Sequence, residues 1–212
     1  TDFYDPKNVD QIKVEKKSKE WKVDKEKFII LLPGRLTRWK GQEVFIDALN
    51  ILTEKYNIKS FFAIILGDDQ GRKVYSKKLE SLIDRYRLNN NVIFAPNCDE
   101  MPLAYEIANV VVSSSIEPEA FGRVSVESQS MQKPIIASNI GGSKETVIND
   151  KTGFLVEAGN SNALADKLIE AMNMDHWTLQ SMGIEGRKNV LKKFDIDRMC
   201  FSTFSEYKKL LE

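Results

Sequence analysis

The 212-residue sequence predicts an α/β domain in which helices cover both faces of a parallel sheet. Several short apolar runs, such as 28–32 and 61–66, have the length and continuity of strands buried on both faces. Segments with apolar residues at helical spacing separate these runs, so strand and helix alternate along the chain. This order predicts a Rossmann-like doubly wound parallel sheet of about six strands, followed by a helical tail.

Each expected element follows from its local pattern. The first 26 residues are rich in Lys, Asp and Glu, which predicts an irregular or partly ordered lead-in over 1–26. We expect strands at 28–32, 61–66, 91–95, 110–113, 134–138 and 153–156. We expect helices at 44–52, 75–86, 101–107, about 121–132, shortly after 142, and 164–172. The tail 183–211 is expected to be helical with a break near Phe194 and Asp195, so the expected divisions are 1–26, 27–194 and 195–212.

Composition excludes several classes of protein. Basic and acidic side chains balance at 31 each, so no global charge favours nucleic acid or an anionic membrane. No apolar run approaches the roughly 18 residues of a membrane span. Cys98 and Cys200 lack metal or redox spacing and are expected to be reduced core thiols of a cytosolic protein. The chain begins with Thr1 rather than Met, and we expect it to be a piece of a longer protein.

Two carboxylates frame the most informative stretch of the chain. Glu119 precedes a helix expected to begin near Phe121 or Gly122, and Glu127 lies inside that helix. Between them, the free N–H groups of a helix N-terminus offer a site for a phosphate. An acid, an anion site and a second acid could hold the hexose, the diphosphate and the ribose of a nucleotide sugar. Two glutamates at this spacing also occur by chance in a charged protein, so the rest of the chain must support this interpretation.

A second phosphate signal follows the first strand. Gly34 and Arg35 begin a loop that ends at Lys40, so two cations bracket a short connection between strand and helix. A guanidinium fork and a mobile ammonium could together clamp a diphosphate. The chain contains neither the G-x-G-x-x-G pattern of a dinucleotide fold nor a P-loop. Asp195 and Asp197 match an Asp-x-Asp metal pattern, but they lie at a helix start, where capping is the expected role. No metal and no cofactor are expected, and His176 is expected to be structural.

Taken in order, these motifs resemble the C-terminal domain of the retaining GT-B glycosyltransferases of family 4, also called group 1. The resemblance runs from Phe28 onward, and even residues 1–6 resemble the segment just after the hinge between the two domains. Its landmarks are Gly34-Arg35 with Lys40-Gly41, Gly67-Asp68, 91–94, 113–122, Glu127, 134–137, Gly141-Gly142 with Glu145, and 153–156.

The resemblance implies a role for each matching residue. Arg35 and Lys40, after Gly34, match the pair that holds the donor diphosphate. Glu119 matches the acid that contacts the donor sugar, and Glu127 the acid that accepts hydrogen bonds from the ribose. Residues that match the turn over the sugar and phosphate are Phe121, Gly122, Arg123 and Val124, and residues expected near the base are Phe94 and Ala95. Arg123 departs from the family pattern, in which an apolar or small residue is common.

The resemblance also implies a function. The parent would transfer a sugar from a UDP-, GDP- or ADP-sugar to a hydroxyl acceptor with retention, in polysaccharide, lipopolysaccharide or glycolipid synthesis. The acceptor domain would be the missing N-terminal half, which could bind the inner face of a membrane, and residues 195–212 would cross back to it. Residues 1–212 alone would then be inactive. Two alternatives remain open, a nucleotide-sugar-binding module without turnover and a GT-B nucleotide-sugar epimerase, although the chain offers no acid–base set for the second.

Overall fold

The computed structural model describes residues 2–211, so Thr1 and Glu212, the outer ends of the expected lead-in and tail, lie outside the described residues. Within this range, parallel strands form one sheet in the order β3-β2-β1-β4-β5-β6. The strands are β1 (Phe28–Pro33), β2 (Phe61–Leu66), β3 (Val92–Ala95), β4 (Val110–Ser113), β5 (Ile135–Ser138) and β6 (Gly153–Val156). This is the strand order of a doubly wound sheet, and the predicted fold class is confirmed.

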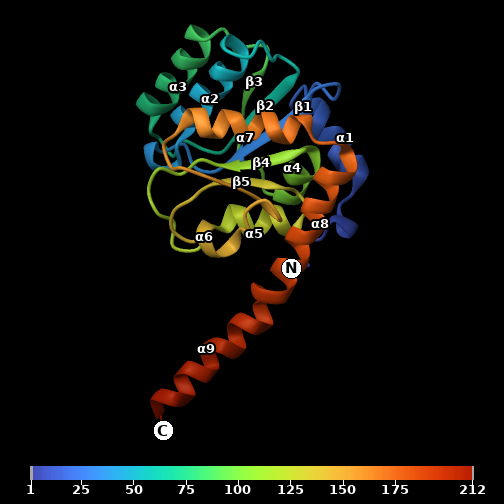
Figure 1. Ribbon diagram of the computed structural model, residues 1–212, viewed down its shortest axis with the longest axis vertical. Coiled ribbons are helices and arrows are strands. Elements are labelled where there is room, and N and C mark those ends of the chain that lie inside the picture. The colour runs from blue at the N-terminus through green and yellow to red at the C-terminus, as the bar shows by residue number, and fades with distance from the viewer. Residues whose placement is uncertain (1, 212) are drawn as a thin grey trace.

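Helices and short 3-10 turns precede, connect and follow the strands (Figure 1). The 3-10 turns are η1 (Pro6–Asn8) and η2 (Arg38–Lys40). The α-helices are α1 (Gln11–Glu20), α2 (Gln42–Glu54), α3 (Lys73–Arg85), α4 (Met101–Ile107), α5 (Arg123–Ser130), α6 (Ser143–Thr146), α7 (Ser161–Asn173), α8 (His176–Lys193) and α9 (Ile196–Leu211). None of the helices within the described residues is long and apolar enough to span a membrane.

The continuous apolar runs form strands because both faces of the sheet are covered. All six residues of β2 are buried, and their side chains alternate between two separate cores. Phe61, Ala63 and Ile65 pack with α2, α3 and α7 on one face. Phe62 and Ile64 pack with residues of α4 and α5 on the other. The sheet is thus the middle layer of three.

The helices that follow the two central strands pack on opposite faces of the sheet. β1 and β4 are hydrogen-bonded neighbours in the sheet. The chain passes from β1 to α2, whose Phe45 and Leu49 pack on the first face. From β4 it passes to α5, whose Val124 packs on the second face. The two loops therefore diverge above the carboxyl ends of β1 and β4, which makes this the topological switch point where such sheets bind ligands.

The N-terminal segment corrects one expectation. An irregular lead-in is wrong for residues 11–20, which form α1. Asp10 caps α1 by accepting a hydrogen bond from the backbone N–H of Ile12 at 2.8 Å. Val14, Ser18 and Trp21 are buried, at positions that share one face of a helix. Because the other positions of this helix are mostly charged, the composition of residues 1–26 did not reveal its narrow buried stripe.

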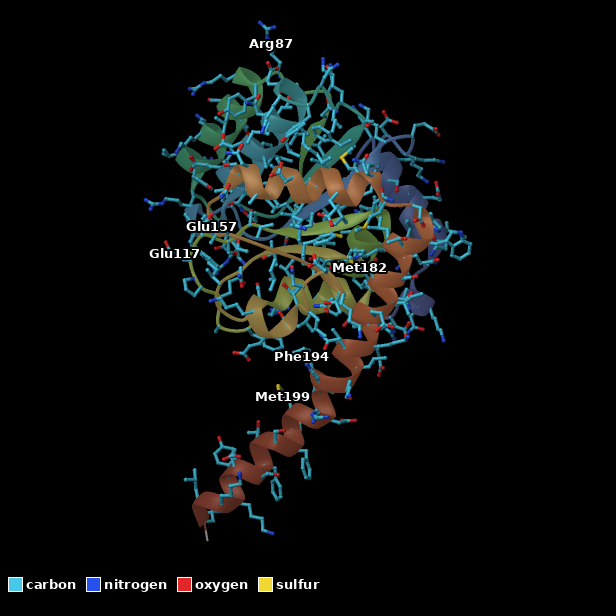
Figure 2. All side chains as sticks on the ribbon, viewed as in Figure 1. Arg87, Glu117, Glu157, Met182, Phe194 and Met199 are labelled. Carbon is cyan, nitrogen blue, oxygen red and sulfur yellow. The ribbon has the colours of Figure 1, made fainter. Side chains whose placement is uncertain are left out.

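The C-terminal segment also differs in detail from the expectation. α8 begins at His176 rather than near 183, because the Asp175 carboxylate accepts a hydrogen bond from the Thr178 N–H at 2.9 Å and caps the helix. The helix ends near Phe194, where a break was expected. α9 then extends away from the body, with Phe194 and Met199 at the junction (Figure 2). Within Ile196–Leu211, none of the side chains is buried.

Candidate functional site

A cavity of about 630 Å³ opens at the topological switch point. Its walls come from the loops that follow β1, β2, β3 and β4, from α4 and the start of α5, and from the N-terminal segment. The polar residues of the lining are Tyr4, Arg35, Trp39, Lys40, Asp68, Gln70, Asn97, Tyr105, Glu119, Arg123 and Glu127. The remaining lining is mostly glycine and apolar side chains, including Gly34, Phe121, Gly122 and Val124.

Glycine lets two of these loops approach closely. Gly67, directly after β2, has φ 155°, and a Cβ at this residue would lie 2.1 Å from the carbonyl oxygen of Gly34. The Gly34 N–H in turn donates to the Leu66 carbonyl at 2.8 Å. The loop after β1 therefore rests on the end of β2, which holds Arg35 at the rim of the cavity.

Lys40 and Glu119 form an ion pair across the switch point. The Lys40 Nζ lies 2.8 Å from Glu119 Oε1, and the side chains are only 13% and 15% exposed. The backbone beneath them is also joined, because the Ile116 N–H donates to the Trp39 carbonyl at 2.8 Å. The loop after β1 and the loop after β4 are thus bound to each other by a charge pair and by main-chain contact.

The indole of Trp39 supports both cations of the first loop. The Lys40 Nζ lies 4.6 Å from the centre of the Trp39 ring, and the Arg35 guanidinium carbon lies 5.9 Å from it. Both distances are within the range of cation–π attraction. The ring thereby holds two positive charges on the same side of the cavity.

The turn that carries Glu119 is supported from below. The Ser115 hydroxyl donates to the Glu119 carboxylate, and the Gly142 N–H donates to the Glu119 carbonyl at 2.8 Å. A Cβ at Gly142 would lie 2.4 Å from the carbonyl carbon and oxygen of Phe121, so only glycine fits under this turn. Gly122 occupies the residue before α5 with φ 77°, and it has no side chain to cap the free N–H groups of the helix. An uncapped helix N-terminus that opens into a cavity can bind an anion.

Glu127 lies in α5, behind this N-terminus, and is only 14% exposed. Its Oε2 accepts a hydrogen bond from the Tyr105 hydroxyl at 2.9 Å. Its Oε1 accepts from the Nε and Nη2 atoms of Arg123 at 3.2 and 3.0 Å. The Arg123 side chain, in contrast, is 80% exposed.

Burial and the charge of Glu127 keep two tyrosines protonated. Burial, reinforced by the neighbouring carboxylate, raises the pKa of Tyr105 well above its usual value. The same two causes, with burial the larger, raise the pKa of Tyr4 to about 12. Both phenols are protonated at neutral pH, as an ordinary tyrosine is, and the raised pKa keeps them hydrogen-bond donors at higher pH as well. The same carboxylate raises the pKa of Arg123, which stays charged.

The family model of the group 1 glycosyl transferases matches residues 13–189, most of the chain. The chain belongs to the group 1 glycosyl transferases. It is 32% identical over 175 residues to the capsular polysaccharide biosynthesis glycosyltransferase CapM of Staphylococcus aureus, a match that covers 80% of the chain and 43% of CapM. The chain therefore spans about half the length of the relatives that it matches.

Three solved structures share the fold. A glycosyltransferase from Rickettsia africae matches the whole chain and 55% of its own length, at 33% identity and a TM-score of 0.93. Anabaena Alr3699/HepE in complex with UDP-glucose matches 97% of the chain and 55% of its own length, at 29% identity and a TM-score of 0.84. The C-terminal domain of the group 1 protein LpcC from Francisella tularensis is covered to 93% by 84% of the chain, at 27% identity and a TM-score of 0.72. The chain thus corresponds to the C-terminal half of a GT-B glycosyltransferase.

Most residues singled out from the sequence meet in this cavity of the group 1 domain. Arg35, Lys40, Glu119 and Glu127 all line it, and Lys40 is in contact with Glu119. The N-terminus of α5 lies between the two acids, although the helix spans only Arg123–Ser130 rather than about 121–132. Phe94 and Ala95 are not among the lining residues, and Ala95 packs in the second core. Asn97, which follows Ala95 by two positions, lines the cavity instead.

Sequence reasoning missed several residues of the wall. Tyr4 reaches the cavity from the N-terminal segment, which Arg187 anchors by donating to the Tyr4 carbonyl at 3.0 Å and to Asp5 Oδ2 at 2.7 Å. Tyr105 reaches it from α4. Both are separated from the acids in sequence, and each looks like an ordinary core aromatic when its segment is considered alone. Among residues 2–211, no group of three His, Cys, Asp or Glu side chains is placed to bind a metal.

Proposed function

We propose that this chain binds the donor of a retaining sugar transfer, in which the whole protein moves a sugar from a nucleotide diphosphate sugar to a hydroxyl acceptor. The main support is one cavity that brings together the α5 N-terminus, Glu119 before this helix, Glu127 within it, and the cations Arg35 and Lys40, of which Lys40 is paired with Glu119. A structural relative, Anabaena Alr3699/HepE, was solved with UDP-glucose. The name of CapM supports a role in capsular polysaccharide synthesis, while lipopolysaccharide or glycolipid synthesis would use the same donor chemistry.

In the proposed complex, the diphosphate lies between the cations and the α5 N-terminus. Arg35, Lys40 and the first N–H groups of α5 stabilise the negative charge that develops as the nucleoside diphosphate leaves. Glu119 accepts hydrogen bonds from the donor sugar. Because Glu119 is paired with Lys40, the groups that bind the sugar and the phosphates are in direct contact. The leaving phosphate helps to deprotonate the acceptor on the same face of the sugar, which gives retention. Glu119 does not act as a covalent nucleophile.

The acceptor is proposed to bind the half of the protein outside this sequence. The chain covers about half of its relatives, and the cavity is lined from one domain only. Residues 1–212 alone should therefore bind the donor but transfer little sugar. The exposed apolar side chains of α9 are available to contact the other half of the protein. We propose that the whole protein acts in the cytoplasm, and at the inner face of the membrane if its acceptor is a lipid.

A thermal-shift panel tests the proposal. UDP-, GDP- and ADP-sugars are compared with the free sugars and with the nucleosides. A donor at about 100 times its dissociation constant should add about 2.7 kcal/mol of stability, and the free sugar should add little. If all members of the panel leave the melting temperature unchanged, the donor-binding role is wrong. If a donor binds and residues 1–212 also transfer its sugar efficiently, the need for a second half is wrong.

A further inference from the structure

The carboxylate of Glu127 has too few free acceptor positions for the ribose that we assign to it. A carboxylate offers about four lone-pair positions. In the ligand-free site, Arg123 donates twice to Oε1, and Tyr105 donates once to Oε2. A ribose that presents both its 2′- and 3′-hydroxyls needs two acceptor positions, and about one remains. One of the two neighbours must therefore give way when a donor binds.

The structure distinguishes these neighbours by burial. Tyr105 is completely buried in the second core, and its side chain lies within 6.0 Å of the Tyr4 ring, edge to face. Moving it would open the core, which is costly. Arg123 is 80% exposed, although Glu127 is not, so the Arg123 guanidinium can move into water without opening the core. Arg123 is thus the neighbour that moves, and Tyr105 is the one that stays.

We propose that Tyr105 is a fixed positioning residue for Glu127 and that Arg123 is a displaceable counterion, which leaves Glu127 when the ribose binds and turns to the diphosphate. This inference rests on the proposed donor-binding role of the cavity. Arg123 is the first residue of α5 and lines the cavity beside the helix N-terminus. Its guanidinium can therefore exchange the Glu127 oxygen for a phosphate oxygen, which binds a guanidinium fork well. In the empty site without Arg123, the negative charge of Glu127 would not be offset by this neighbouring cation, although it lies beside an anion site.

The inference explains why an arginine is compatible with this position. In the empty site, its charge offsets that of Glu127. In the occupied site, the ribose hydroxyls take over at Glu127, and the guanidinium adds a third cation to the Arg35 and Lys40 pair. The two roles predict opposite effects of removing Tyr105 and removing Arg123, because one side chain helps Glu127 to bind ribose and the other competes with ribose.

The test measures how well the protein distinguishes ribose from a sugar without hydroxyls. Calorimetry first identifies which of UDP, GDP and ADP binds most tightly, and that nucleotide is then compared with its 2′,3′-dideoxy counterpart. The ratio of the two dissociation constants is the ribose preference. In Tyr105→Phe, we expect this preference to fall by about threefold or more, since a hydrogen bond that orients the carboxylate is lost. The Tyr86→Phe variant is the matched control, because the Tyr86 hydroxyl also donates to a carboxylate, Asp47, at 2.9 Å, but outside the cavity.

In Arg123→Ala, both nucleotides should bind more weakly because a cation is lost. The ribose preference should nevertheless rise by about twofold or more, because the ribose hydroxyls no longer compete with Arg123 for Glu127. Lys188→Ala is the control, since Lys188 forms an exposed pair with Glu185 on α8, away from the cavity. Arg123 is exposed, so this variant folds even if Tyr105→Phe does not. A lower preference in Arg123→Ala, or an unchanged preference in folded Tyr105→Phe, would overturn the inference alone. If none of the three nucleotides binds the unaltered chain, the proposed function and the inference both fail.

Discussion

Replacing Lys40 by methionine tests the phosphate clamp. The substitution removes the charge, which lies 4.6 Å from the centre of the Trp39 ring, and keeps an unbranched side chain of similar length. In the donor complex, a charge-assisted contact between Lys40 and the diphosphate would contribute about 1.5–3 kcal/mol, which corresponds to about 10- to 150-fold in affinity. The lower end is expected, because Lys40 already pairs with Glu119 at 2.8 Å in the empty site, and binding must share that ammonium with the phosphate. The corresponding nucleoside, which carries no phosphate, should lose about threefold at most.

Isothermal titration of the nucleoside diphosphate and of the nucleoside provides the measurement. The control is Lys78→Met, because Lys78 also pairs with a glutamate, Glu43, but does not line the cavity. Circular dichroism establishes that both variants remain folded. Equal losses for the nucleoside and its diphosphate in Lys40→Met would refute the clamp, since the charge would then not be acting on the phosphates.

Three further predictions concern the N-terminal segment and the tail. Arg187→Ala should lower the free energy of unfolding, measured in urea, by about 2–3 kcal/mol, because Asp5 and two backbone carbonyls lose their hydrogen-bond donor. A loss below about 0.5 kcal/mol would contradict this. The pKa of Tyr4 is raised from 10.0 to about 12, so the folded state holds this proton more tightly, and stability should fall as the pH rises between those values. That fall should be smaller in Tyr4→Phe, and an identical pH profile would exclude Tyr4 as its source. Removal of 195–212 should leave the unfolding free energy of the body unchanged and weaken a concentration-dependent self-association in sedimentation, whereas a destabilised body would show that α9 packs at home.

The sheet was predictable because it is buried on both faces. A strand covered by helices on each side must be apolar at every position, so β2 is visible as an uninterrupted run of six residues. Such a run also fixes its own boundaries, because a glycine or a polar residue ends it. The alternation of runs and amphipathic segments then determines that the strands are parallel.

Elements with one narrow buried stripe were harder to predict. Within α1, only Val14 and Ser18 are buried, joined by Trp21 at the end of the helix, and the remaining positions are mostly charged. The start of α8 depends on one cap, Asp175, which determines where the helix begins without any apolar signal. The long stripe of α9 predicted its helix, but amphipathicity alone could not decide whether the stripe is covered, and within Ile196–Leu211 it is exposed.

The site was predictable where its residues follow one another in the chain. Glu119, the α5 N-terminus and Glu127 occupy a single stretch, so their spacing carries the geometry. Contacts between distant segments could not be predicted in this way. The Lys40–Glu119 pair and the Tyr105–Glu127 hydrogen bond depend on how the loops diverge above the sheet. Phe94 and Ala95, which were expected near the base, precede the lining residue Asn97 by three and two positions, because β3 still buries Ala95 before the chain reaches the cavity.

A crystal structure with the tightest-binding nucleoside diphosphate tests the central claim most directly. The account predicts the diphosphate at the N-terminus of α5, within hydrogen-bonding distance of Arg35 or Lys40, and the ribose hydroxyls on Glu127 with Arg123 displaced. A nucleotide bound elsewhere on the chain, or bound in this cavity with its ribose away from Glu127 and its phosphates away from α5, would contradict it.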